Sequence, residues 1–257
     1  MNTLMLIGNP LGHSFSQRYF EAKFAREGIE GWRYYNAPMA DIEMLRDAVI
    51  SDPCLRGFNV TIPHKQAVMQ MLDRIDDEAV AIGAVNCVKI TREEGFRGKI
   101  ADGICLEGFN TDVYGFRDSL TEVIADRRPD ALVLGTGGAS KAVCHALETL
   151  GIRYETVSRR KSDGSLCYDD VDGSVVTGHE LIVNTTPLGM YPKTEAAPEI
   201  DYASLTDNHI LFDLIYNPGD TMFLRRGRRA HATTIGGYGM LVRQAEKGWE
   251  IFSNRLM

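Results

Sequence analysis

The sequence contains no long hydrophobic run. The apolar stretch nearest its start, residues 4–7, is followed at once by Gly8-Asn9-Pro10, and no basic segment precedes it. A secretory signal needs about 7–15 apolar residues behind a basic segment, and a membrane-spanning helix needs about 20 apolar residues. We therefore expect neither, and we expect a cytoplasmic protein.

Cysteine and histidine are few, and their spacing is not typical of metal sites or disulfide frameworks. The five cysteines are scattered without a C-x-x-C pair, and the six histidines show no H-E-x-x-H pattern. This pattern favours reduced thiols in a cytosolic protein over a disulfide framework. We expect no bound metal, and we expect His13 and His64 to make hydrogen bonds in loops.

Basic residues are fewer than acidic ones, 28 against 35. The formal net charge is −7, which argues against a protein that binds nucleic acid or an anionic membrane. One basic run, Arg225-Arg226-Gly227-Arg228-Arg229, has no interleaved aromatic residue and follows Asp220-Thr221, which are good helix-start residues. We interpret this run as the solvated end of a helix.

Short strand-like runs alternate with segments of helical period, which indicates an α/β fold with mostly parallel strands. Strands are expected at residues 5–8, 57–61, 84–90, 131–134, 154–158, 181–183 and 210–214. Helices are expected at residues 16–27, from residue 63 toward residue 72, and at residues 116–124, 140–150 and 240–252. A polar hairpin or loop is expected at residues 91–106.

A glycine-rich turn, Gly135-Thr136-Gly137-Gly138-Ala139-Ser140, lies between a predicted strand and a predicted helix. Such a turn lets a pyrophosphate approach the helix N-terminus, where unpaired N–H groups and the helix dipole favour anions. Ser140 stands where the usual pattern has its third glycine, so a plain strand-to-helix turn is the alternative. The next strand ends at Ser158-Arg159-Arg160-Lys161. Arginine suits the 2′-phosphate of NADP there, whereas an NAD enzyme would carry an acid.

Further short motifs follow one another along the chain. They are Gly12-His13-Ser14-Phe15-Ser16, Asn59-Val60-Thr61-Ile62-Pro63-His64-Lys65, Gly83-Ala84-Val85-Asn86, Gly108-Phe109-Asn110-Thr111-Asp112, Asn184-Thr185-Thr186-Pro187-Leu188-Gly189-Met190, Tyr216-Asn217-Pro218 and Gly237-Tyr238-Gly239-Met240-Leu241-Val242-Arg243-Gln244. Taken together and in this order, they resemble the shikimate dehydrogenase family, and they cover essentially the whole chain. That family joins an N-terminal α/β substrate domain to a Rossmann-like NADP-binding domain, and its C-terminal helix returns to the first domain.

The resemblance implies the reversible NADPH-dependent reduction of 3-dehydroshikimate to shikimate, a step of aromatic amino acid (chorismate) biosynthesis. It also implies a substrate domain of residues 1–111 and 238–257 and an NADP-binding domain of residues 112–237. We expect a small-molecule substrate, no nucleic-acid or membrane partner, and a monomer or homodimer.

Carried over motif by motif, the family's site residues fall into three groups. The substrate carboxylate is expected to contact Ser14, Ser16 and Tyr216. The ring hydroxyls are expected to contact Thr61, Asn86, Asp112 and Gln244, with Lys65 and Asp112 at the reacting carbon. NADP is expected to contact Gly135, Gly137, Gly138, Ala139, Ser140, Ser158, Arg159 and Arg160, with Asp77, Leu214 and Gly237 as weaker additions near the nicotinamide.

These residue types suit the reaction. Hydride transfer to a ketone builds negative charge on its oxygen, so a cation or a proton donor must lie beside it. Lys65 can serve as either, and the sequence leaves open whether it transfers the proton or acts as a fixed charge. Ser14 and Ser16 can present two hydroxyl donors to one carboxylate if the loop is extended. Asp112 also qualifies as a cap of the helix that follows it.

The sequence departs from the family pattern at several places. Gln17 replaces the usual proline after the second serine, and Ser158 replaces a common asparagine. The gap from Asn86 to Asp112 is longer than usual by about ten residues, which a surface hairpin can absorb. Alternatives on the same scaffold are a quinate/shikimate or aminoshikimate dehydrogenase and a non-catalytic metabolite-sensing paralogue. The paired serines favour shikimate, and retention of Lys65 with Asp112 argues against a non-catalytic paralogue.

Overall fold

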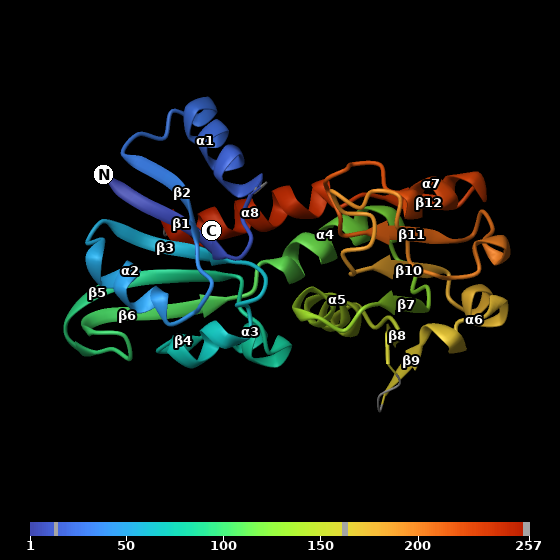
Figure 1. The fold of residues 1–257 in the computed structure, drawn as a ribbon, viewed down its shortest axis with the longest axis horizontal. Helices are drawn as coiled ribbons and strands as arrows, with labels where there is room; N and C mark the ends of the chain where they lie inside the picture. The colour runs from blue at the N-terminus through green and yellow to red at the C-terminus, as the bar shows by residue number, and fades with distance from the viewer. Residues whose placement is uncertain (13–14, 161–163, 254–257) are drawn as a thin grey trace. The chain divides into compact units, whose positions relative to one another are not determined.

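The chain folds into two compact units, each with its own β-sheet (Figure 1). The computed structural model describes residues 1–12, 15–160 and 164–253. The first unit comprises Met1–Thr111 and Ala245–Met257, and the second comprises Asp112–Gln244. Across those described ranges, no helix has the length and apolar character that crossing a membrane requires.

The first unit is built on a mixed sheet. Its described residues form six strands in the order β2-β1-β3-β5-β6-β4. The strands are β1 (Asn2–Gly8), β2 (Trp32–Pro38), β3 (Leu55–Val60), β4 (Arg74–Ile75), β5 (Cys87–Arg97) and β6 (Asp102–Phe109). β1 is parallel to β2 and to β3, whereas β5 is antiparallel to both β3 and β6. The helices packed with this sheet are α1 (Phe15–Glu27), α2 (Met44–Ser51), the 3₁₀ helix η1 (Ala67–Met71), α3 (Asp77–Ile82) and the end of α8 (Tyr238–Ser253).

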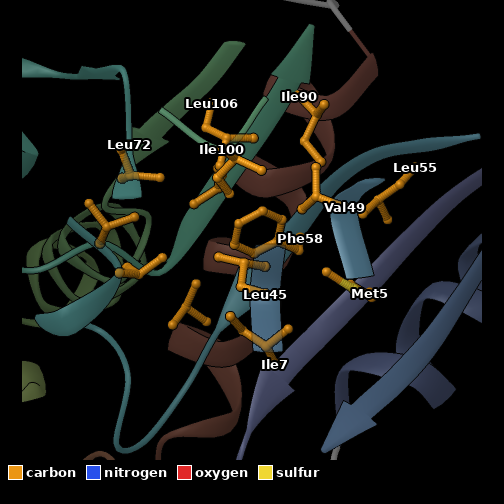
Figure 2. Packing of buried hydrophobic residues seen from close by; sticks show 14 of the residues in the cluster. Met5, Ile7, Leu45, Val49, Leu55, Phe58, Leu72, Ile90, Ile100 and Leu106 are labelled. Atoms are coloured by element: carbon orange, nitrogen blue, oxygen red, sulfur yellow. The ribbon is translucent and has the colours of Figure 1, made fainter. Parts of the chain in front are cut away.

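Alternation along β1 gives the first unit an apolar core on each side of its sheet, because successive side chains of a strand point to opposite faces. Met5 and Ile7 join Leu45 of α2 in the core drawn in Figure 2. Leu4 and Leu6 point the other way and pack with residues of α1 and α8. The strand is therefore apolar at every position of its buried centre, as expected for a strand covered on both faces.

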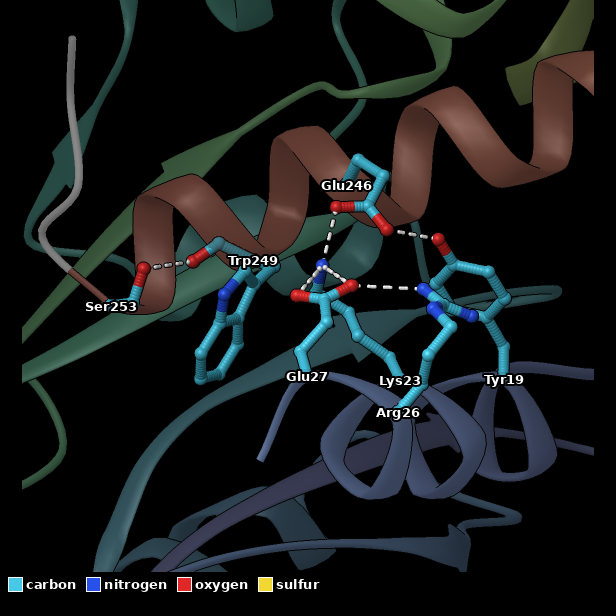
Figure 3. Close-up of polar contacts among 7 residues, drawn as sticks. All are labelled: Tyr19, Lys23, Arg26, Glu27, Glu246, Trp249 and Ser253. Atoms are coloured by element: carbon cyan, nitrogen blue, oxygen red, sulfur yellow. Dashed lines mark hydrogen bonds and ion pairs between the residues drawn. The ribbon is translucent and has the colours of Figure 1, made fainter. Parts of the chain in front are cut away.

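The C-terminal helix α8 ends in the first unit, as the sequence predicts. Lys23 of α1 is buried, and its Nζ lies 2.7 Å from Glu246 Oε2 on α8 and 2.8 Å from Glu27 Oε2 (Figure 3). The Tyr19 hydroxyl donates to the other carboxylate oxygen of Glu246. Trp249, one turn further along α8, packs against the aromatic residues of α1. The ion pair of buried Lys23 with Glu246 and the aromatic contacts of Trp249 thus hold α8 against α1.

We expect Lys23→Met to lower the free energy of unfolding by about 2 kcal/mol, because it leaves two carboxylates side by side without their shared cation. Both carboxylates are partly exposed, which keeps the loss below the range of about 3–5 kcal/mol for fully buried pairs. Urea unfolding followed by circular dichroism measures the effect. The matched control is Lys247→Met, which removes a more exposed lysine from an i,i+3 pair on α8. Equal losses in the two variants would contradict a special role for Lys23.

The second unit contains a parallel sheet with the strand order of a Rossmann fold. Its described residues form six strands in the order β9-β8-β7-β10-β11-β12, and each neighbouring pair is parallel. The chain lays down β7 first, adds two strands to one side and then three to the other, which is the order of dinucleotide-binding folds. The strands are β7 (Ala131–Leu134), β8 (Tyr154–Ser158), β9 (Ser165–Cys167), β10 (Leu181–Asn184), β11 (Ile210–Asp213) and β12 (Thr233–Ile235).

Helices pack with this parallel sheet. They are α4 (Asp112–Ile124), α5 (Gly138–Thr149), the 3₁₀ helix η2 (Tyr168–Asp170), α6 (Gly173–Gly178), the 3₁₀ helix η3 (Tyr202–Ser204) and α7 (Met222–Arg229). Thr221 caps α7, because its Oγ1 accepts a hydrogen bond from Leu224 N at 3.3 Å. This confirms the predicted helix start at Asp220-Thr221. The predicted α/β fold, with an N-terminal α/β unit and a Rossmann-like unit, is confirmed as well.

One predicted helix differs from the structure. The helix expected from residue 63 toward residue 72 is only the short η1. The Lys65 carbonyl accepts a hydrogen bond from Val85 N at 2.8 Å, so it is not available to a helical ladder. Of the two alternatives for residues 91–106, the hairpin is the one observed, since β5 and β6 pair along this segment.

Candidate functional site

The predicted substrate motifs of the first unit gather at one edge of its sheet. Because β1 and β3 are parallel, the segments that follow them leave from the same edge, and they carry Ser16, Thr61 and Lys65. β5 is antiparallel to β3, so Asn86, which immediately precedes β5, lies at that edge too. β6 is antiparallel to β5, which brings Thr111 to the same place. The topology thus joins motifs that are far apart in the sequence.

Asn86 is the central polar residue at this edge. Its backbone N–H donates to Phe109 O at 3.1 Å, and its carbonyl accepts from Val60 N at 2.8 Å. Its side chain is buried, with Oδ1 accepting from Thr111 N at 2.7 Å and Nδ2 donating to Thr111 Oγ1 at 3.1 Å. These contacts fix the amide plane. Within the described residues they use one Nδ2 hydrogen, and the second can meet a substrate hydroxyl.

Sequence reasoning missed two buried polar residues at this edge, Tyr34 and Asn59. The Tyr34 hydroxyl donates to Asn59 Oδ1 at 2.9 Å, and Asn59 Nδ2 donates to Asn86 O at 3.3 Å. Burial holds the pKa of Tyr34 well above its ordinary value, and a hydrogen bond with Ser16 opposes that shift. Hydrogen bonds therefore link Tyr34 to Asn86 through Asn59. An asparagine inside the apolar strand β3 was the one available signal.

Further predicted residues of the first unit lie in the segments that follow β1 and β3. Thr61 and Lys65 follow β3 directly, and both are partly exposed. His64 between them is buried, and its Nε2 forms a hydrogen bond with a loop carbonyl at 2.8 Å, which is the predicted loop role. Ser14 and His13 lie outside the described residues.

The glycine-rich turn of the second unit leaves the carboxyl end of β7. Gly135 has φ +117°, and a Cβ there would collide with Thr185 Oγ1, so this position requires glycine. Gly135 N donates to Val157 O at 2.8 Å, and Ser140 Oγ donates to Gly135 O at 2.7 Å. Ser140 stands where the usual motif has a third glycine, and its hydrogen bond to the Gly135 carbonyl stabilises the turn.

The turn presents the N-terminus of α5 as an anion cradle. Gly137 is its N-cap, and within the described chain no side chain caps the first N–H groups of this helix. A Cβ added at Gly137 would meet no atom within 4 Å, so the space beside this residue is open. A pyrophosphate suits such a place, because it can accept hydrogen bonds from these N–H groups and is favoured by the helix dipole. The residues present fit the predicted dinucleotide.

The basic residues after β8 lie at the same edge of the sheet, because β7 and β8 are parallel. Arg159 and Arg160 are both exposed. Ser158 Oγ donates to the Arg160 carbonyl, which holds the turn in shape. Planar guanidinium groups present several N–H donors to a phosphate, so this turn fits the 2′-phosphate of NADP. Lys161 lies outside the described residues.

Two further predicted cofactor residues follow strands of this sheet, and a third does not. Leu214 follows β11 and Gly237 follows β12, and a Cβ at Gly237 would collide with the Leu214 carbonyl. Tyr216, predicted for the substrate carboxylate, follows Leu214 closely in the chain. Asp77 begins α3 in the first unit, whereas the other cofactor residues belong to the second, so its place near the nicotinamide stays a prediction.

Asp112 and Gln244 lie on neighbouring helices of the second unit. Asp112 is the buried first residue of α4. One turn further along, Gly115 has no side chain, and a Cβ there would meet Met240 O at 2.5 Å and Gln244 Cβ at 3.2 Å. This close approach brings Gln244 against the first turn of α4. Lys65 belongs to the other unit, so its pairing with Asp112 stays a prediction.

Asp213 is a buried carboxylate at the end of β11. It accepts hydrogen bonds from Thr221 Oγ1 at 2.6 Å, Ile215 N at 3.0 Å and Asn184 Nδ2 at 3.1 Å. Burial raises the pKa of Asp213 to about 6, and the three hydrogen bonds oppose this shift. Asp213 thus orders the segment that carries Leu214.

We expect the stability of the protein to depend on pH through Asp213. Its folded-state pKa exceeds the value of about 4 in an unfolded chain, so its contribution is fully present below about pH 4 and is lost as the pH rises through about 6. Asp213→Asn cannot ionise, so its free energy of unfolding should gain about 2 kcal/mol relative to the wild type between about pH 4 and pH 7. Urea unfolding over this range measures the gap. The exposed Asp207→Asn is the control. A constant gap for Asp213→Asn would refute the assignment.

Comparisons with known proteins agree on one family. A family profile described as the shikimate dehydrogenase substrate binding domain matches residues 6–88. A shikimate dehydrogenase (NADP(+)) of Clostridium beijerinckii is 37% identical over 256 residues, which cover 96% of this chain and 90% of that protein. The crystal structure of shikimate dehydrogenase 1 from Peptoclostridium difficile has a TM-score of 0.80 at 36% identity, covering 99% of this chain and 92% of that one. Quinate dehydrogenase from Corynebacterium glutamicum, in complex with NAD, has a TM-score of 0.83 at 28% identity, with coverage of 98% and 94%.

Proposed function

Because the chain belongs to the shikimate dehydrogenase family, we propose that it catalyses the reversible NADPH-dependent reduction of 3-dehydroshikimate to shikimate. It is an oxidoreductase that acts on a CH–OH group, and the step belongs to aromatic amino acid biosynthesis. The observation that carries the proposal is the gathering of Ser16, Thr61, Lys65 and Asn86 at one sheet edge. The open cradle at the N-terminus of α5 supports the cofactor.

Different polar residues bind different groups of the substrate. Ser16, together with Ser14 and Tyr216, binds the carboxylate. Thr61 and Asn86 bind ring hydroxyls from the first unit, and Asp112 and Gln244 bind them from the second. The hydrogen bonds from Tyr34 to Asn59 and from Asn59 to the Asn86 carbonyl hold Asn86 in position at the hydroxyl end. A substrate with both groups at the matching separation is therefore held in one orientation, which is worth several kcal/mol in rate.

When bound, NADP(H) donates or accepts the hydride at the reacting carbon. Lys65 lies beside the oxygen on that carbon, where it stabilises negative charge as the carbonyl is reduced and supplies the proton that completes the hydroxyl. In the oxidation it takes the same proton back. Asp112 accepts a hydrogen bond from the substrate hydroxyl and orients the Lys65 ammonium.

Steady-state assays with purified protein test this function. Shikimate and quinate would each be offered with NADP and with NAD, and formation of the reduced cofactor followed by absorbance. We expect turnover of shikimate with NADP to be the fastest of the four combinations. Preference for quinate with NAD would move the protein to the activity named for the Corynebacterium glutamicum relative. No turnover of either acid would favour a metabolite-sensing paralogue.

We also propose that the enzyme works in the cytoplasm on small molecules, without a nucleic-acid or membrane partner, and as a monomer or homodimer. The net charge of −7 supports the absence of nucleic acid, because binding to phosphate backbones relies on basic surfaces. Light scattering coupled to size-exclusion chromatography distinguishes monomer from dimer. A mass above that of a dimer would refute the proposed assembly.

A further inference from the structure

The second unit carries a pocket that neither the cofactor cradle nor the predicted substrate residues explain. It is a shallow depression between η3 and α7 that is widely open to solvent, with a volume of about 520 Å³. Its walls are formed by Tyr202, Ala203, Leu205, Arg226, Arg229 and Ala230. Two of these six residues are arginines, and none is acidic.

The pocket lies at the opposite edge of the sheet from the cofactor cradle. η3 precedes the start of β11, and α7 ends just before the start of β12. The strands are parallel, so these elements mark the amino edge of the sheet, whereas the glycine-rich turn follows the carboxyl end of β7. In dinucleotide-binding folds the cofactor occupies the carboxyl edge. A ligand in this pocket would therefore be distinct from NADP.

The arginines of α7 divide into two pairs. Arg228 forms an ion pair with Asp220, and Arg225 lies 3.8 Å from Glu195. Arg226 and Arg229 instead face the pocket, and within the described part of the chain neither forms an ion pair. They are three residues apart, so they lie on one side of the helix. The sequence predicts that this run is the solvated end of a helix. On one side of the helix acidic residues neutralise the arginines, and on the other side the arginines keep their charge.

Arg226 is held in place by an aromatic ring. Its guanidinium carbon lies 4.7 Å from the centroid of the Tyr202 ring. The Tyr202 hydroxyl donates to Pro198 O at 2.8 Å, which fixes the ring. A guanidinium that lies over an aromatic ring can still offer N–H donors to an anion. Asp201 is the acidic residue nearest to Tyr202 along the chain. It accepts hydrogen bonds from Ala203 N and Ser204 Oγ, so it caps η3.

We propose that this pocket binds a small aromatic carboxylate. Arg226 and Arg229 would bind the carboxylate through charge-assisted hydrogen bonds, which are about twice as strong as neutral ones. The exposed parts of Tyr202 and Ala230 would pack against the flat apolar body of the ligand. The pocket is large enough for one substituted ring.

Isothermal titration calorimetry with 4-hydroxybenzoate tests the proposal on the full chain in the presence of saturating NADP. We expect saturable binding in about the millimolar range. Arg229→Ala and Arg226→Gln should each weaken it by about tenfold or more, because each removes a charge-assisted contact. Arg225→Ala and Arg228→Ala are matched controls on the same helix and should leave the affinity within about twofold. Phenol, which has the ring without the charge, and acetate, which has the charge without the ring, should both bind at least tenfold more weakly.

Several results would overturn the proposal. The first is the absence of saturable binding. The second is an equal loss of affinity in Arg229→Ala and in either control variant, Arg225→Ala or Arg228→Ala, because it would indicate attraction by the charge of the helix alone. Acetate binding as tightly as 4-hydroxybenzoate would reduce the site to a general anion site. Arg229 is exposed, so Arg229→Ala should fold normally, and circular dichroism verifies this independently of binding.

Discussion

Lys65→Met is expected to lower kcat for shikimate oxidation by about 10³-fold, the range of general acid–base and electrostatic contributions combined. Methionine keeps the length and apolar stem of lysine but can neither carry charge nor transfer a proton. Lys65 is partly exposed, directly after β3, and its carbonyl is anchored to Val85 N. The substitution leaves that backbone contact in place. KM for shikimate should change by less than about tenfold, because carboxylate and hydroxyl contacts come from other residues.

The control for this variant is Lys89→Met, which removes a partly exposed lysine from β5 in the same unit. It should retain kcat within about twofold. Steady-state assays of both variants, with circular dichroism to establish folding, measure the difference. If Lys65→Met raised KM and left kcat intact, Lys65 would be a binding residue and the proposed proton transfer would be wrong.

The Rossmann-like unit could be predicted closely from sequence. The strands β7 and β8 were expected at the residues where they occur. β7 is a continuous apolar run, as expected for a strand buried in a parallel sheet. The glycine turn added a second local signal, since Gly135 adopts a backbone conformation that other residues disfavour. Both signals lie within a few residues of the element they predict.

The first unit was harder to predict because its signals are weaker or non-local. β2 is partly buried along most of its length, so its residues show no clean alternation, and α2 has only eight residues and no side-chain cap. The short η1 depends on a hydrogen bond from Val85, twenty residues from Lys65 in the chain. Tertiary contacts of this kind leave no local pattern.

In the candidate site too, residues with a local sequence signal could be predicted and residues defined by tertiary contacts could not. The motifs identified Ser16, Thr61 and Asn86 because each falls in a recognisable segment of the family. Tyr34 has no such segment, and its importance follows only from its hydrogen bond to Asn59 across the sheet. Motif resemblance therefore finds residues that contact ligands, while the buried residues that connect them require the fold.

Arg159→Ala is expected to raise KM for NADP by about tenfold to a hundredfold while kcat changes little. Loss of a charge-assisted hydrogen bond to the 2′-phosphate accounts for this magnitude, and a contact far from the reacting carbon contributes equally to ground and transition states. Arg159 is exposed at the carboxyl end of β8, so its removal should not disturb the core. KM for NAD should stay nearly constant, because NAD lacks the phosphate.

The ratio of kcat/KM for NADP to that for NAD is the decisive quantity, since it cancels any general loss of activity. Arg33→Ala, which removes an exposed arginine from β2 in the first unit, is the charge-matched control and should leave the ratio unchanged. A fall in both efficiencies by the same factor in Arg159→Ala would mean that Arg159 acts on the fold of the turn. If Arg159→Ala instead left both efficiencies unchanged, NADP selectivity would be assigned to Arg160, whose alanine variant should then show the effect expected here.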